Sequence, residues 1–125
     1  MTLQEALDMA DEMKPNMMKR ETKIRHLTDL EEMIWAEIVM KHVHTPQQAV
    51  KPHYTDDSDP GTVLLVPDPY SSLYPFWIMS RIDLLNQELD KYNNDRALFE
   101  NAYNEMHDWW NRTKMPVQRN RQIWI

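Results

Sequence analysis

Cysteine is absent from this 125-residue chain, and glycine occurs once, at Gly61. Without cysteine the chain forms no disulfide, offers no thiolate to a metal and has no cysteine nucleophile. One glycine is too few for the glycine-rich loops that cradle phosphate groups, and it argues against an all-β fold with many tight turns. The composition therefore excludes several common kinds of catalytic and cofactor site.

Long apolar runs are also lacking. No stretch approaches the roughly 20 apolar residues that a membrane-spanning helix needs. The first residues, MTLQEALDMADEM, are acidic and amphipathic, whereas a secretory signal has a basic start and an apolar centre. We therefore expect a protein that is made in the cytoplasm and does not insert into a membrane. Its length suits one domain with its own core.

The net charge of −6 is distributed unevenly along the chain. Residues 111–125 carry four basic side chains and no acid, so the other 110 residues have a net charge of −10. Residues 52–80 carry neither Lys nor Arg, and their four acids are Asp56, Asp57, Asp59 and Asp68. An acidic loop and a basic tail favour contacts between neighbouring subunits of an assembly. The alternative is a solvated loop and a frayed tail.

The spacing of apolar residues predicts an all-α domain of four helices. The first helix is expected at residues 3–13, with Thr2 as its N-cap and Glu5 completing a capping box. The second is expected from residues 18–21 to about residue 42, after a cap at Asn16. About 22 residues would make a rod of about 33 Å, which suits packing against other copies.

Most of the twelve aromatic residues lie in the second pair of helices. The third helix is expected from residues 71–72 to about residue 92, with Pro75 in its first turn. The fourth follows a break at Asn93-Asn94 and runs to a stop at Pro116. The two helices would form either a hairpin or one kinked rod, and they would contain the core.

Between the two pairs, residues 44–69 form a long connection that holds five of the eight prolines. Asp59-Pro60-Gly61 is a turn signal, and residues 63–66 are a short apolar run suited to a strand or an extended segment. Loops of this length without secondary structure are usually functional or disordered. We expect a partly ordered loop that reaches a partner.

Residues with the potential for chemistry do not form a recognisable catalytic motif. His42, His44 and His53, with the nearby aspartates, have the chemistry of a zinc site. No HExxH motif supports such a site, and surface histidines near a helix end are the favoured interpretation. The neighbouring carboxylates Glu31-Glu32 and Asp56-Asp57 would point apart into solvent. We therefore expect no enzymatic activity, no cofactor and no bound metal.

The last residues predict an extended arm, residues 117–125, beyond a helical domain of residues 1–116. The arm is too short and too rich in β-formers for a helix, and its alternation suits strand addition or docking in a pocket of a protein partner. The candidate partner-binding residues are Arg119, Arg121, Ile123, Trp124 and Ile125 of the arm and Asp56, Asp57 and Asp59 of the loop. Alternatively, the arm folds back onto its own helices, or it contacts nucleic acid, for which the acidic body is unfavourable.

Several short segments of the second half of the chain resemble one family of phage proteins. The segments are Val66-Pro67-Asp68-Pro69-Tyr70, Leu73-Tyr74, Ile82-Asp83, Tyr92-Asn93-Asn94, Phe99-Glu100-Asn101-Ala102-Tyr103, Asn111-Arg112-Thr113 and Met115-Pro116. In these residues the chain resembles the head–tail connector, or adaptor, proteins of long-tailed phages and of prophages in Gram-positive bacteria. They contain no catalytic motif.

The resemblance implies a mostly helical structural protein of the virion. Its copies would form a ring beneath the portal protein at the head–tail junction and present a surface to the tail-completion protein. DNA would pass through the ring as cargo. A terminal or loop segment of such proteins docks on the portal, and residues 117–125 are the candidate here. The alternative is a small prophage-encoded regulatory or DNA-associated helical protein, which would need a basic helix face that none of the expected helices has.

Overall fold

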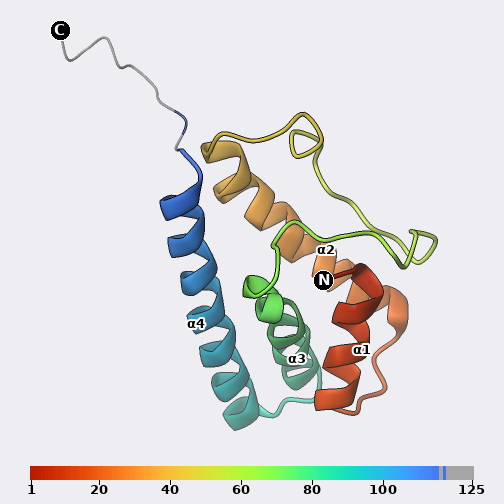
Figure 1. Cartoon of the computed structure of the whole chain (residues 1–125). Coiled ribbons are helices and arrows are strands. Elements are labelled where there is room, and N and C mark those ends of the chain that lie inside the picture. The colour runs from red at the N-terminus through yellow and green to blue at the C-terminus, as the bar shows by residue number, and fades with distance from the viewer. Residues whose placement is uncertain (116, 118–125) are drawn as a thin grey trace, which may run out of the picture.

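The computed structural model describes residues 1–115 and Val117, and helices dominate it (Figure 1). The four α-helices are α1 (Leu3–Met13), α2 (Arg20–Glu37), α3 (Leu73–Leu85) and α4 (Leu89–Thr113). There are also two short 3-10 helices. η1 (Val39–Lys41) follows α2, and η2 (Tyr70–Ser72) precedes α3. The described residues contain no β-strand beyond single bridges, so the predicted all-α class is confirmed.

α1 begins and ends where the sequence predicts. The hydroxyl of Thr2 accepts a hydrogen bond from the Glu5 backbone at 3.1 Å, and the Glu5 carboxylate accepts one from the Thr2 backbone at 3.1 Å. These two bonds are the expected capping box. The apolar face of α1 is buried through Leu3, Ala6, Leu7 and Ala10.

α2 is shorter than the rod that the sequence predicts. It has 18 residues, and after Glu37 the chain continues as the 3-10 helix η1. Its N-cap is Lys19, which makes no capping bond through its side chain, whereas Asn16 accepts a hydrogen bond from the Met18 backbone at 3.0 Å. Asn16 therefore shapes the turn that leads into α2 and does not cap it. The longest helix is α4, with 25 residues.

α3 and α4 form an antiparallel hairpin, which settles the choice between a hairpin and a kinked rod (Figure 1). The predicted break at Asn93-Asn94 is wrong, because both residues lie within α4. The chain turns instead at residues 86–88, where Gln87 adopts a left-handed conformation with φ of 57°. Pro75 lies in the first turn of α3, as expected.

α3 is the central helix of the bundle and contacts α1, α2 and α4. The largest fully buried side chains come from all four helices and include Leu3, Leu27, Leu30, Ile34, Tyr74, Ile78, Ile82 and Met106. The aromatic-rich second pair therefore supplies much of the core, and α2 contributes an equally continuous apolar stripe. Within the described residues, none of the helices combines the length and apolar character that crossing a bilayer requires.

The segment between η1 and η2 runs outside α2 and returns across the N-terminus of the chain (Figure 1). Leu3 N donates to Thr62 O at 2.8 Å, and Leu64 N donates to Met1 O at 3.0 Å. An isolated antiparallel bridge joins Thr2 to Val63 between these bonds. The apolar run at residues 63–66 is therefore an extended segment held by the N-terminus, not a strand of a sheet.

Candidate functional site

Met115 and Val117, the last described residues of the chain, lie beside the residues that follow α2. Val43 N donates to Met115 O at 2.7 Å, and Val117 N donates to Lys41 O at 2.8 Å. These bonds are of the antiparallel kind, in which the two chains run in opposite directions. The first part of the predicted arm is therefore attached to the end of η1.

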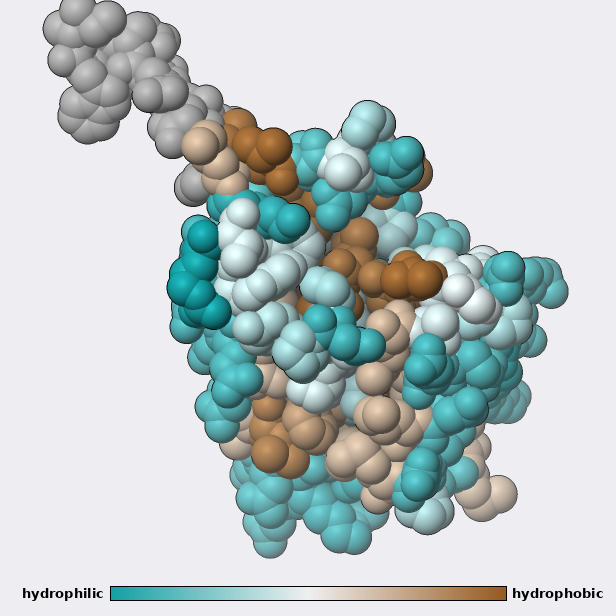
Figure 2. Space-filling model, in the orientation of Figure 1, coloured by the Kyte–Doolittle hydropathy of each residue, from teal (hydrophilic) through white to brown (hydrophobic). Residues whose placement is uncertain are grey.

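Exposed apolar side chains surround this attachment. Val43, Met115 and Val117, which we call the arm-base patch, are 59%, 66% and 46% exposed. Figure 2 shows hydrophobic surface at the upper edge of the described residues. A hollow of about 320 Å³ lies beside the patch, lined by Val43, His44, Thr45, Gln48, Thr113, Lys114 and Met115. Apolar side chains that gather at a surface in this way are typical of a binding site.

The acidic loop is a pair of hydrogen-bonded turns beside the first turn of α2. Asp56 forms an ion pair with Arg20. Asp59 accepts a hydrogen bond from Gly61 N at 2.8 Å through its carboxylate. Asp56, Asp57 and Asp59 are all exposed. The turns therefore hold three carboxylates at the surface, and one of them is already paired with α2.

The two predicted binding surfaces lie at opposite ends of α2. Asp56 contacts Arg20, the first residue of the helix, whereas Val117 is bound to Lys41 beyond its last turn. The helix between them is about 27 Å long, at 1.5 Å per residue. The predicted arm residues Arg119, Arg121, Ile123, Trp124 and Ile125 lie outside the described residues.

The three histidines do not converge on a common point. His42 is buried, and its ring lies 2.8 Å from the side-chain oxygen of Asn111 on α4. His44 contacts the backbone of His42, while the exposed His53 lies 3.8 Å from the carboxylate of Glu32. In residues 1–115 and 117, no three His, Asp or Glu side chains lie close enough to hold a metal ion. The expected surface position is wrong for His42, which links η1 to α4.

A buried carboxylate joins α2 to the proline-rich segment. Glu31 accepts hydrogen bonds from the Tyr54 hydroxyl at 2.9 Å, from Leu65 N at 3.0 Å and from the Tyr74 hydroxyl at 2.5 Å. Burial raises the pKa of Glu31, and these donors oppose the rise. The expectation that Glu31 is solvated is wrong. Its burial could have been predicted from its position within the apolar stripe of α2, four residues after Leu27.

A second polar cluster lies where α1 ends. The Lys14 ammonium forms an ion pair with Asp83 of α3 and lies 2.9 Å from Asp95 of α4. Burial raises the pKa of Asp83 to about 6, Asp95 adds to the rise, and Lys14 opposes it. The Asp83 side chain is 1% exposed. This cluster links three helices from inside the bundle, which is a structural role.

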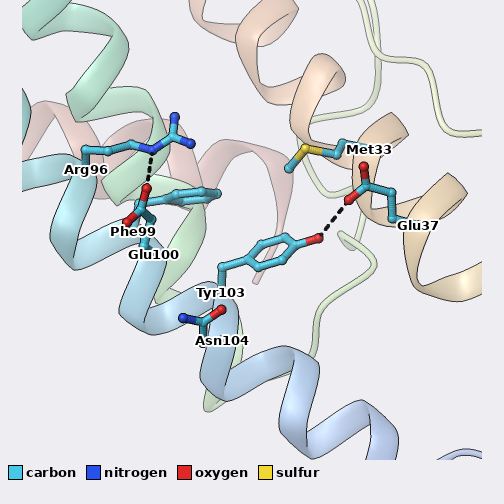
Figure 3. Close-up of a pocket in the computed structure, with 7 residues that line it drawn as sticks. All are labelled: Met33, Glu37, Arg96, Phe99, Glu100, Tyr103 and Asn104. Atoms are coloured by element: carbon cyan, nitrogen blue, oxygen red, sulfur yellow. Dashed lines mark hydrogen bonds and ion pairs between the residues drawn. The ribbon is translucent and has the colours of Figure 1, made fainter.

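A groove of about 390 Å³ separates α2 from α4. Figure 3 shows the residues that line it, Met33 and Glu37 from α2 and Arg96, Phe99, Glu100, Tyr103 and Asn104 from α4. The Tyr103 hydroxyl donates to Glu37 at 3.3 Å, and Arg96 donates to Glu100 at 3.0 Å. The walls thus combine two carboxylates and one guanidinium with aromatic and thioether side chains. No signal in the sequence pointed to this site, because its walls are distant along the chain.

Comparison of the chain with models of known protein families, with curated proteins and with solved structures found no match. The function is therefore inferred from the surfaces described above and from the sequence resemblance.

Proposed function

We propose that this chain is a structural head–tail adaptor of a phage and is not an enzyme. It binds its own copies in a ring beneath the portal protein and joins the capsid to the tail-completion protein. The observation that carries the proposal is the arm-base patch, because Val117, the first residue of the predicted arm, is attached there among exposed apolar side chains. Such a surface suits a partner that packs against the patch and binds the arm.

The separation of the two candidate surfaces supports an assembly of many copies. The acidic turns lie at the start of α2, and the arm base lies beyond its end. A contact between different surfaces of two identical chains repeats from copy to copy and closes into a ring when the rotation allows it. Charge complementarity between Arg119 or Arg121 of the arm and Asp57 of the turns favours this kind of contact.

The charge of the body supports a place beside a DNA channel. With a net charge of −10 outside residues 111–125, the body does not attract the phosphate backbone. DNA would therefore pass as cargo without binding tightly. This property favours the adaptor over a DNA-associated regulator, which would need a basic face.

The test is a pull-down with the tagged chain from a lysate of the induced host, with partners identified by mass spectrometry. We expect the full-length chain to capture the portal and tail-completion proteins. A chain truncated after Met115 should retain its helical circular dichroism spectrum and capture neither. A variant with Arg119→Glu and Arg121→Glu keeps the full length of the chain, so it separates loss of the arm's charges from loss of the residues themselves. Capture of transcription proteins or DNA without virion proteins would contradict the proposal.

A further inference from the structure

The groove between α2 and α4 has the chemistry of a site for a basic, aromatic peptide. Glu37 and Glu100 place carboxylates on opposite walls, Arg96 pairs with Glu100, and the half-buried Tyr103 supplies ring surface between the walls. The centroid of the buried Phe99 ring lies 5.7 Å from that of Tyr103, so Phe99 supports the Tyr103 ring from the core. A peptide with both cationic and large apolar side chains would fit these walls.

The arm begins near the α2 wall of this groove. Val117 is hydrogen-bonded to Lys41, which lies four residues after Glu37 in the chain. Because the bonds at the arm base are antiparallel, the chain that reaches Val117 is running back toward α2. Residues 118–125 have an extended reach of about 26 Å. The α4 wall of the groove is about 12 Å long, so residues 118–125 are longer than the wall that they would follow.

The composition of the arm matches the walls. Arg119 and Arg121 are separated by one residue, so in an extended chain they lie on the same side. The charged side chains of the groove are Glu37, Glu100 and Arg96, so its walls carry a net charge of −1 that these arginines complement. Residues 123–125 are Ile-Trp-Ile, the most apolar part of the arm, and contact with the half-buried ring of Tyr103 would remove this surface from water.

From these three observations we infer that residues 118–125 dock in the α2–α4 groove of their own chain in the free subunit. Arg119 and Arg121 pair with Glu37 and with Glu100, which they share with Arg96, and Trp124 packs on the ring of Tyr103. Docking of the arm does not depend on the proposed function, but its consequence for assembly rests on that function. The portal would compete for the docked arm, so assembly would begin at the portal and not in free solution.

The absence of cysteine from the chain permits a direct test by disulfide trapping in the full-length protein. One variant carries Asn104→Cys in the groove and Asn120→Cys in the arm. The matched control carries Asn101→Cys, an exposed position on α4 that does not line the groove, with the same Asn120→Cys. Each substitution leaves the net charge unchanged. The measured quantity is the rate of disulfide formation within monomers, from intact mass and peptide mapping under mild oxidation.

We expect the groove pair to form its disulfide several-fold faster than the control pair. Adding Glu37→Gln and Glu100→Gln should lower the rate toward that of the control, and so should high salt. Equal rates for the groove and control pairs would overturn the inference.

A mixture of two single-cysteine chains, Asn104→Cys in one and Asn120→Cys in the other, distinguishes a second copy as the occupant. Linked dimers that form faster than the intramolecular disulfide would overturn docking within the same chain. These outcomes are independent of portal capture, so failure of arm docking and failure of the adaptor proposal are separately visible.

Discussion

The hydroxyl of Tyr54 donates a hydrogen bond to the buried carboxylate of Glu31 at 2.9 Å. Tyr54 lies in the segment between η1 and η2, and Glu31 lies on the core face of α2. The bond therefore fixes the proline-rich segment to the helical body. Since Glu31 is fully buried, its charged form depends on the donors around it.

Tyr54→Phe removes one donor from Glu31 and leaves the ring in place. We expect the free energy of unfolding to fall by about 1–2 kcal/mol, because a buried carboxylate loses a hydrogen bond. Urea denaturation measures the change. The matched control is Tyr103→Phe, whose hydroxyl contacts Glu37 at 3.3 Å near the surface and should contribute less than about 0.5 kcal/mol. Equal effects of the two substitutions would show that the Glu31 network is not important for stability.

Lys14→Met removes the cation that Asp83 and Asp95 share. Two carboxylates would then lie together in the bundle without a counter-charge, and we expect a loss of about 3 kcal/mol in the free energy of unfolding. Lys91→Met is the control, since Lys91 pairs with Glu88 at the surface, and its denaturation midpoint should not change measurably. A Lys14→Met chain as stable as the wild type would contradict the assigned role.

Asp83 should make stability depend on pH. Its pKa is raised from 3.8 to about 6 by burial and by Asp95, so the folded chain binds this proton more tightly than the unfolded chain. The resulting stabilisation is complete below about pH 4 and is lost as the pH rises through about 6. Relative to Asp83→Asn, the wild type should gain about 1 kcal/mol between about pH 7 and about pH 5. Urea denaturation of both chains across this range measures the difference, and a difference that does not vary with pH would contradict the raised pKa.

Gln87→Gly should stabilise the hairpin between α3 and α4. Gln87 has a φ of 57°, a conformation that costs a side-chain-bearing residue free energy and costs glycine little. We expect a gain of about 0.5–1 kcal/mol, measured by thermal or urea unfolding. Gln87→Val should have the opposite effect, because a β-branched residue is strained at positive φ. Destabilisation by glycine would mean that a contact of the Gln87 side chain stabilises the fold by more than the positive φ costs.

The same turn explains why the boundary between α3 and α4 was predicted at the wrong residues. Gln87 N donates to Leu84 O and Glu88 N donates to Asp83 O, the pattern of a Schellman motif. That motif usually places glycine at the left-handed position, and here glutamine occupies it. Asn93-Asn94 has the composition of a helix cap but lies inside α4, since tertiary packing against α3 outweighs local preference.

Local patterns were sufficient for α1, whose capping box and apolar face lie within a few consecutive residues. The polar clusters were not predictable in this way. Glu31 and Tyr74 are 43 residues apart in the chain, and Lys14 and Asp83 are 69 apart. The α2–α4 groove is likewise formed by helices that meet only in the folded chain. Such contacts depend on the order in which helices pack, which the periodicity of one segment does not determine.

The most direct test of the adaptor proposal mixes the purified full-length chain with the phage portal protein that the proposal names as its partner. Size-exclusion chromatography and negative-stain electron microscopy would follow the mixture. We predict that the chain co-elutes with the portal and adds a ring of density beneath it, and that truncation after Met115 removes both effects without loss of helicity. Separate elution of the full-length chain and an unchanged portal image would contradict the proposal.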